Sequence, residues 1–461
     1  MNILNVLTFA YSLELLAVGA APDMRIAVIG GGISGLSAAW MLSQQHEVTV
    51  FEAERQPGGH SRTIQFRLDD RDYSIDVGFI VWNDRTYPLF MELLRLLDVA
   101  GVPTEMSFAV RCDRTGLEYS GTSLNGVFAQ RSRLLSPSFL RMVLDILRFN
   151  SLGASDADLV GSTETVGQYL RRRGFGRGFK EHYLLPMGAA IWSCPMGTFA
   201  DFPIQFILEF YRNHGLLSLT NRPQWYTIPG GSRNYVTRLI QPFADRIVSD
   251  APVRRIRRSA TAVTVVTDTT ESSFDEVVLA CHSDQALALL EQPTADETRI
   301  LSGFPYSSND VVLHTDETIL PRSRRAWSAW NYRVGRDDAR ATVTYNMNIL
   351  QHIQSPHTFC VTLNDTDSIR PESIISRHKF SHPIFTTERA ALQQEHRSLI
   401  RTRRTSFCGA WWGNGFHEDG VRSALAVCRE FGIAGLTPVT PLRLQTAPQT
   451  ADSGNLAVVG G

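Results

Sequence analysis

The residues with the clearest chemistry form a glycine-rich turn between two β-rich runs. Gly30, Gly32 and Gly35 follow the first run and open a helical apolar pattern, and Glu52 closes the second run. In a dinucleotide-binding turn the first glycine makes the tight turn, the second lets the backbone approach a diphosphate, and the third lets helix and strand pack closely. The carboxylate of Glu52 can accept both hydrogen bonds of a ribose diol and would repel a 2′-phosphate. The spacing therefore predicts a dinucleotide site that disfavours NADP.

The stretch after the second β-rich run distinguishes FAD from NAD. Gly58 and Gly59 form a second glycine pair, His60 follows, and an Asp-x-Gly strand ends in Gly78 and Phe79. These motifs resemble those of the flavin-containing amine oxidoreductase superfamily, which includes amine oxidases, protoporphyrinogen oxidases and carotenoid desaturases. The resemblance implies that the second glycine pair runs against the diphosphate and the flavin edge, a contact that NAD dehydrogenases do not need. We therefore expect FAD as the cofactor.

Two later segments extend the resemblance. Val253 begins a strand at the position whose backbone meets the adenine in the family, and a glycine turn at 407–410 precedes a helix predicted over 421–431. The resemblance implies that the N–H groups of Gly420 and Val421 point at a flavin carbonyl, because a helix N-terminus stabilises negative charge there. The match spans almost the whole chain. Within the superfamily it is similar to a bacterial group of predicted NAD/FAD-binding proteins of unassigned substrate.

The chain departs from the family motifs at a few positions. His60 stands where the family usually has arginine, so its contact with phosphate or flavin should be weaker and pH-dependent. Ala410 replaces an acidic residue that binds the ribityl chain, and Asp419 and Glu418 are candidates to replace that hydrogen bond. Cys408 does not match the cysteine that binds flavin covalently in some members, so we expect non-covalent FAD. The cofactor contacts implied by the resemblance are Gly30, Gly32, Ser34, Gly35, Glu52, Gly58, Gly59, His60, Gly78, Phe79, Val253, Gly409, Asp419, Gly420 and Val421.

Lysine is missing where amine oxidases commonly use it. In that family a lysine near the flavin holds a water molecule, but the corresponding stretch 304–350 has none, and Lys180 and Lys379 are the only lysines. True amine oxidation is therefore disfavoured. Hydride removal from an activated C–H bond of a small or apolar substrate, as in desaturases, or isomerisation is favoured instead. A true amine oxidase, a redox-silent flavin-binding assembly protein and an enzyme that uses NAD alone are the alternatives.

Aromatic and histidine side chains supply candidates for the substrate pocket. Trp192, Trp412 and His417 lie in or beside the motif-bearing segments, where they could enclose a substrate over the flavin. Each is also typical of an ordinary core position. His378 and His382 have the i, i+4 spacing of a metal-binding pair on a helix, but a proline follows directly and no carboxylate pattern accompanies them. No metal site is predicted.

Composition limits the remaining classes of function. The 461 residues carry a net charge of −1, which gives no indication of a nucleic-acid partner. The six cysteines are scattered without a C-x-x-C pair, which favours free thiols in a reducing compartment and a cytoplasmic protein. The sequence leaves the oligomeric state open.

Residues 131–150 could form an interaction surface apart from the dinucleotide site. Over 131–150, four arginines alternate with leucines and other apolar residues, which predicts an amphipathic basic helix. Such a helix is typical of a solvated face on a globular domain, and the alternative is peripheral contact with a membrane. The expected partner is a small-molecule substrate, with a lipid among the candidates.

Two domains are needed to position these motifs. We expect an α/β fold in which a Rossmann-like FAD-binding domain is completed by a discontinuous substrate domain of mixed sheet and helices. The first segment is apolar but lacks the basic start of a secretory signal. The predicted segments are 1–23 (leader or mis-assigned start), 24–100, 229–290 and 405–432 (FAD-binding domain), 101–228 and 291–404 (substrate domain) and 433–461 (poorly ordered tail).

Overall fold

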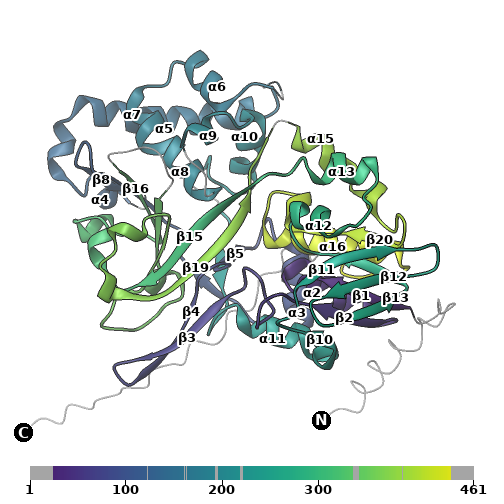
Figure 1. Ribbon diagram of the computed structural model, residues 1–461. Coiled ribbons are helices and arrows are strands. Elements are labelled where there is room, and N and C mark those ends of the chain that lie inside the picture. The colour runs from purple at the N-terminus through teal and green to yellow at the C-terminus, as the bar shows by residue number, and fades with distance from the viewer. Residues whose placement is uncertain are drawn as a thin grey trace, which may run out of the picture.

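The computed structural model describes residues 24–437 except 122, 160, 162, 193–195, 219–221, 336–341 and 387. Figure 1 shows a sheet-and-helix domain around β1 and β2, and a second domain in which the long strands β15 and β19 lie below a group of helices. The predicted leader lies outside the described residues, as does most of the predicted tail. At the start of that tail, Ile433 and Leu436 are buried against the first domain.

A parallel sheet of five strands forms the centre of the first domain. Its strand order is β10-β2-β1-β14-β20, and each neighbouring pair is parallel. The strands are β1 (Arg25–Ile29), β2 (Glu47–Phe51), β10 (Ile247–Val248), β14 (Glu276–Leu279) and β20 (Thr405–Phe407). The chain therefore builds this sheet from three segments that lie far apart in the sequence.

Alternate residues of β1 pack into two different layers, because successive side chains of a strand point to opposite faces. Ile26 and Val28 pack with one set of helices, whereas Ala27 and Ile29 pack with a three-stranded sheet and two further helices. The first layer holds α2 (Ile33–Leu42), α3 (Pro88–Leu96), α11 (Arg233–Ile240) and α16 (His417–Glu430). The second holds β11 (Val253–Arg258), β12 (Val263–Thr267), β13 (Glu271–Phe274), α12 (Ser283–Leu289) and α13 (Ala295–Leu301).

The second domain is built on a mixed sheet of seven strands in the order β19-β15-β18-β17-β16-β7-β8. Only the pair β7 and β16 within this sheet is parallel, among the described residues. The strands are β7 (Phe108–Cys112), β8 (Leu117–Ser120), β15 (Tyr306–His314), β16 (Trp330–Val334), β17 (Thr342–Asn346), β18 (Cys360–Leu363) and β19 (Ile374–Pro383). The predicted fold class, a Rossmann-like domain with a mixed-sheet and helical second domain, is confirmed.

Helices cover one end of the second domain and surround an aromatic core. Phe149, Tyr169 and Phe179 are fully buried there. The main helices are α5 (Pro137–Asp156), α6 (Val166–Arg172), α8 (Leu185–Ile191), α9 (Met196–Ala200) and α10 (Ile204–Asn213). None of the helices within the described part of the chain combines the length and apolarity needed to cross a bilayer.

Two predicted helix boundaries differ from the structure. The segment 131–150 is not one helix: a 3-10 turn at Arg131–Leu135 precedes α5, whose start is set by the Ser136 hydroxyl, which accepts the N–H of Phe139 at 3.4 Å, and by a proline in the first turn. Helix α16 begins four residues before the predicted start, because the carboxylate of Asp419 accepts the N–H of Phe416 at 3.0 Å and closes the first turn.

Candidate functional site

Three glycine turns from distant parts of the chain meet at one place. A Cβ built on Gly59 would lie 3.0 Å from the Cα of Gly32. A Cβ built on Gly420 would lie 2.9 Å from the hydroxyl oxygen of Ser34. The turns around Gly32, Gly59 and Gly420 are thus in direct contact, which is the arrangement that a single extended cofactor requires.

The glycines of the first turn differ in what surrounds them. Gly30 has φ +107°, a conformation that L side chains rarely adopt, and a Cβ on Gly35 would collide with the carbonyl oxygen of Gly30. Nothing lies within 4 Å of a Cβ built on Gly32. The geometry fits the three expected roles, because Gly30 makes the turn, Gly35 packs against it, and Gly32 faces open space where a diphosphate can approach.

Glu52 lies directly beside the first glycine turn. Its carboxylate accepts the N–H of Gly31 at 2.7 Å and the N–H of Glu54 at 2.8 Å, and the residue is 9% exposed. The N–H of Ala251 donates to the carbonyl of Glu52 at 3.0 Å, which brings the start of the strand at Val253 beside it. Glu52 and Val253 are therefore placed together, as the ribose and adenine end of a dinucleotide would need.

His60 follows the second glycine turn, and its ring packs against a group of buried aromatic side chains. A Cβ on Gly78 would collide with the carbonyl of His60, which accepts the N–H of Phe79 at 2.7 Å. The ring of His60 lies 4.8 Å from that of Phe380 and 5.2 Å from that of His382, and its Nε2 is buried with no partner in the described part of the chain. Burial, followed by the charge of His382, holds the pKa of His60 well below its ordinary value. Burial therefore favours the neutral imidazole of His60, which argues against a pH-dependent contact.

A chain of side-chain amides fixes the tautomer of His382. The N–H of Asp310 donates to Oδ1 of Asn364 at 3.0 Å, and Nδ2 of Asn364 then donates to Oδ1 of Asn309 at 2.7 Å. Nδ2 of Asn309 donates to the carbonyl of Ser307 at 3.2 Å and meets Nδ1 of His382 at 2.9 Å. Because Nδ1 must accept, the ring proton of His382 lies on Nε2.

Lys379 does not take part in this group. His382 and Phe380 lie on one face of β19, and Lys379 lies on the other, because side chains alternate along a strand. The ammonium of Lys379 is 4.0 Å from the carboxylate of Asp310, and its side chain is 77% exposed. His378 and His382 both belong to β19, so their i, i+4 spacing is that of one strand face and not of a helix.

His417 is buried at the start of α16, between the second and third glycine turns. Its ring stacks on Phe79, with the centroids 3.6 Å apart and the planes 15° from parallel. Its Nε2 is 2.9 Å from the hydroxyl of Ser61 and 3.1 Å from the hydroxyl of Tyr235, and these two hydroxyls also hydrogen-bond to each other. Burial lowers the pKa of His417 to about 3. His417 is therefore neutral and connects the turn after Gly59 to α16.

The early start of α16 changes which amides are free at its N-terminus. The N–H of Gly420 donates to the carbonyl of Phe416 at 3.1 Å, so Gly420 and Val421 lie inside the hydrogen-bonded helix. The amides that a helix leaves without an intrahelical partner are the first ones, here those of His417 and Glu418. This corrects the expected amide role. Gly420 contributes its missing side chain instead, because it permits close contact with Ser34.

Both acidic candidates at this end of α16 already have protein partners. Asp419 closes the turn at Phe416, and its carboxylate also accepts from Arg422 at 3.0 Å. Glu418 accepts the N–H groups of Leu89 and Phe90, at 3.0 Å and 2.9 Å, at the start of α3. The two carboxylates thus stabilise helix termini, and their expected contact with a ribityl chain in place of Ala410 stays a prediction.

The tryptophan candidates lie in separate cores. Trp412 is 9% exposed and stacks on His396, with centroids 4.2 Å apart, one short turn after Gly409. Trp192 is 5% exposed and packs on Phe210 in the helical core, with centroids 4.8 Å apart. Each tryptophan has a buried Nε1 with no partner within the described residues. The structure does not bring Trp192 and Trp412 together.

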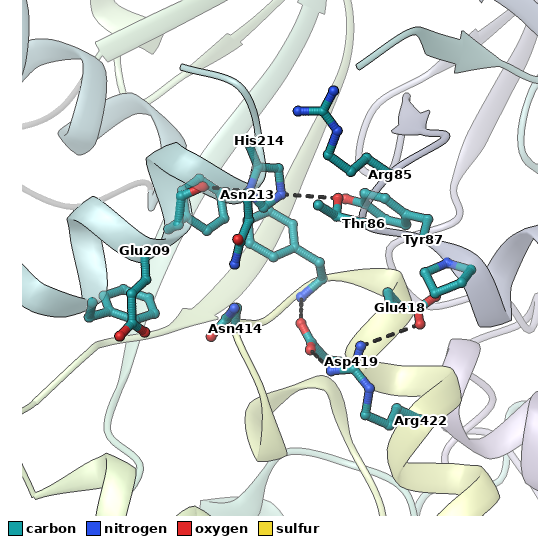
Figure 2. Close-up of a pocket in the computed structure, with 14 residues that line it drawn as sticks. Arg85, Thr86, Tyr87, Glu209, Asn213, His214, Asn414, Glu418, Asp419 and Arg422 are labelled. Atoms are coloured by element: carbon teal, nitrogen blue, oxygen red, sulfur yellow. Dashed lines mark hydrogen bonds and ion pairs between the residues drawn. The ribbon is translucent and has the colours of Figure 1, made fainter. Parts of the chain in front are cut away.

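A cavity of about 410 Å³ opens between α10, the start of α3 and the start of α16. Figure 2 shows His214 and Asn213 on one side, Tyr87 and Arg85 opposite, and Asp419 and Glu418 at the base. Burial lowers the pKa of His214 to about 4, and burial raises the pKa of Asp419. Trp192, Trp412 and His417 do not line this cavity. Its lining residues are Arg85, Thr86, Tyr87, Pro88, Phe206, Glu209, Phe210, Asn213, His214, Asn414, Phe416, Glu418, Asp419 and Arg422.

The geometry fits a flavin dinucleotide, and comparison with known proteins gives the same class. The family model described as flavin containing amine oxidoreductase matches residues 33–346. The chain belongs to this family and is a flavin-dependent oxidoreductase.

Three known proteins that the chain resembles over most of its length are between 15% and 25% identical to it. A protein of Mycobacterium tuberculosis named as a candidate flavin-containing monoamine oxidase, AofH, is 25% identical over 345 residues, which cover 70% of each chain. The fatty acid isomerase of P. acnes that produces CLA has a similar fold, with a TM-score of 0.64 and 16% identity over 90% of this chain and 100% of the isomerase. Cyclohexylamine oxidase of Brevibacterium oxydans gives a TM-score of 0.64 at 15% identity, over 89% of this chain and 100% of the oxidase.

Sequence reasoning missed the pair formed by Asn309 and His382 and the aromatic lining of the cavity. Asn309 and His382 lie on two different strands and are 73 positions apart in the sequence, so no local pattern predicts their contact. The lining had a usable signal, because Phe206 and Phe210 of α10 and His214 directly after it recur every four residues.

Proposed function

We propose that the protein binds FAD non-covalently across the three glycine turns and oxidises a small, apolar organic substrate. The observation that carries the reaction type is the neutral group formed by His60, His382 and Asn309. When bound, the flavin would supply an acceptor for a hydride that leaves a substrate carbon. A neutral imidazole and an amide suit a substrate that brings no charge with it.

Different residues of the chain suit different parts of such a cofactor. The open side of Gly32 and the free amides of a helix N-terminus suit the diphosphate. The carboxylate of Glu52 suits the ribose hydroxyls. Nε2 of His60 is a buried polar atom without a partner in the described part of the chain. The tautomer of His382 that Asn309 fixes carries its proton on Nε2, so β19 also presents an N–H donor. Both atoms would orient a polar edge of the cofactor or the substrate without adding charge.

The cavity supports an apolar substrate over an amine. Phe206, Phe210 and Phe416 supply aromatic surface, and the rings of Phe210 and Phe416 stack 5.4 Å apart. A protonated amine would need a free carboxylate, and two of the three carboxylates that line the cavity, Glu418 and Asp419, are held by Arg422 at 3.3 Å and 3.0 Å. The third, Glu209, accepts from the neutral amide of Gln205 at 3.3 Å. Aromatic walls with two neutralised carboxylates favour a substrate that is recognised by shape and apolar contact.

The cofactor proposal is tested by releasing the flavin. Purified protein should absorb near 450 nm, and acid precipitation should leave FAD in the supernatant, where mass spectrometry identifies it. Flavin that stays with the precipitated protein would show a covalent bond and overturn this part of the proposal. FMN in the supernatant would also overturn it, since Glu52 would then have no ribose of an adenosine to bind.

The substrate proposal is tested by mixing the flavin-loaded protein with candidate reductants under anaerobic conditions. Unsaturated fatty acids and other apolar unsaturated molecules are expected to bleach the flavin absorbance, and amines are not. A true amine oxidase is the second candidate, favoured by the similarity to AofH, and bleaching by amines with peroxide release in air would establish it. Reduction by dithionite alone would instead indicate a redox-silent flavoprotein.

A further inference from the structure

Exposed leucines gather on one part of the helical domain. Of the nine large apolar side chains that are exposed in the described part of the chain, seven lie between residues 124 and 159. Five of them form a continuous stretch of the 3-10 turn and α5, which we name the leucine face. Its members, with their exposed fractions, are Leu134 (47%), Leu135 (89%), Leu140 (39%), Leu144 (62%) and Leu147 (46%).

The leucine face is not the buried side of its helix. Phe139, Met142 and Phe149 point inward and are between 0% and 4% exposed. Residues 140, 144 and 147 have the i, i+4, i+7 spacing of a single helix face, and that face lies opposite the buried one. A solvated helix normally carries polar residues on its outer side. Helix α5 is apolar on both sides, so its outer side lacks a partner.

The charge around the leucine face is strongly positive. Residues 131–150 contain four arginines and one aspartate, so 4 − 1 gives +3, against −1 for the whole chain. The aspartate, Asp145, is 2% exposed and pairs with Arg141 at 3.4 Å and with Arg148 at 3.9 Å. Arg131 and Arg133 hydrogen-bond only to neutral oxygens of the chain within the described residues. Their charges therefore remain available at the surface.

We propose that the leucine face docks on an anionic membrane surface. The leucines enter the boundary between head groups and acyl chains, and the guanidinium groups of Arg131 and Arg133 bind lipid phosphates. A second copy of the chain is a poorer occupant, because a two-fold contact would bring one segment of charge +3 against another. This docking does not depend on the identity of the cofactor or on any redox reaction.

The docking surface is connected to the cavity through one layer of helices. Helix α10 packs directly on α5, and a Cβ on Gly153 of α5 would lie 3.1 Å from the side chain of Leu208 on α10. The same helix carries Phe206 and Phe210 in the cavity wall. A membrane-bound orientation would place this aromatic wall one helix away from the bilayer, which suits an apolar molecule that partitions into lipid.

Vesicle flotation with the full-length, flavin-loaded protein tests the proposal. Vesicles of phosphatidylcholine with about one third phosphatidylglycerol should bind the protein, pure phosphatidylcholine should bind it less, and raising NaCl to about 0.5 M should weaken binding. The double variant Leu135→Ser/Leu144→Ser should reduce binding roughly tenfold or more, because it removes inserted apolar surface. Leu96→Ser is the matched control, since Leu96 is 44% exposed on α3, away from the leucine face, and should leave binding unchanged.

Light scattering and circular dichroism complete the test. The double variant should keep the fold, because both leucines are exposed. Failure of the wild-type protein to float with anionic vesicles overturns the proposal, as does equal loss of binding in Leu96→Ser. A dimer of the wild-type protein that the double variant dissociates, without vesicle binding, would assign the leucine face to a second copy and also overturn it. Flavin content is recorded in each sample, so failure here is distinct from failure of the proposed function.

Discussion

Gly32 and Gly59 face each other so closely that a Cβ on Gly59 would lie 3.0 Å from the Cα of Gly32. The space around the two glycines nevertheless differs. Gly59 has φ +57° and is confined by the protein itself, whereas a Cβ on Gly32 would meet nothing within 4 Å. A side chain at Gly32 is therefore tolerated by the fold and excluded only by a ligand.

The variant Gly32→Ala separates ligand binding from folding. We expect the melting temperature of the flavin-free protein to stay unchanged, because the added methyl group meets open space. Overpacking against a bound diphosphate costs about 1–3 kcal/mol, which lowers flavin affinity roughly ten- to hundredfold. Fluorescence titration with FAD measures this loss. Gly197→Ala is the control, since a Cβ there also meets nothing within 4 Å, and it should bind flavin as the wild type does.

Flavin affinity should be independent of pH between pH 6 and pH 9. The pKa of His60 lies well below its ordinary value, so its imidazole is neutral throughout this range and its contact with the cofactor does not titrate. Equilibrium titrations with FAD at several pH values measure the dependence. Tighter binding as the pH falls from 7 to 6 would mean that a charged His60 holds the cofactor, contrary to the buried geometry.

The variant Asn309→Asp should change the protonation of His382. A carboxylate in place of the amide cannot donate to Nδ1, so the ring proton moves to Nδ1, and the nearby charge raises the pKa of His382 by roughly 1–3 units. In the wild type, burial lowers this pKa to about 4. Nitrogen-15 NMR of labelled histidine reports both the tautomer and the pKa. Asn125→Asp is the control: Asn125 is exposed in the short helix α4 (Leu124–Val127), so this change should leave the His382 signal unchanged.

The protein should lose stability in mild acid because several histidines are buried in the neutral form. For a base whose pKa is depressed on folding, the unfolded chain binds protons first, so the free energy of unfolding falls as the pH drops below about 6.5. Burial lowers the pKa of His417 to about 3 and that of His214 to about 4. Each contributes a loss of up to about 2 kcal/mol between pH 7 and pH 5.

Urea unfolding at pH 7 and pH 5 measures this effect, and His417→Gln should make the difference between the two values smaller. His352→Asn at an exposed position serves as the control and should show the wild-type difference. An unfolding free energy that is the same at both pH values in the wild type would argue against neutral, buried imidazoles.

The nucleotide turn could be predicted from the sequence because its determinants are local. Gly30, Gly32 and Gly35 lie within six residues, and their requirements come from backbone geometry that a short motif specifies. The fold class followed from the same reasoning, since a strand, a glycine turn and a helix define a βαβ unit. The contact between Gly59 and Gly32 was also accessible, although only through resemblance to a family.

The remaining features depend on contacts that no local pattern encodes. An i, i+4 histidine pair shares one face of a strand as well as one face of a helix, so the spacing of His378 and His382 could not decide between them. The start of α16 was placed too late because Gly420 was treated as a helix start, whereas the carboxylate of Asp419 closes the turn earlier. The cross-strand register that brings Asn309 to His382 is set by tertiary packing.

The order of segments in the parallel sheet has a consequence for biosynthesis. Strand β20 and helix α16 come after all the other described strands and helices in the sequence, yet they complete the sheet and the third glycine turn. A nascent chain that has not yet released these two elements holds the glycine turn before α2 without its counterpart. We expect the cofactor to bind only after α16 has emerged, so a product truncated before β20 would be colourless and open to proteolysis.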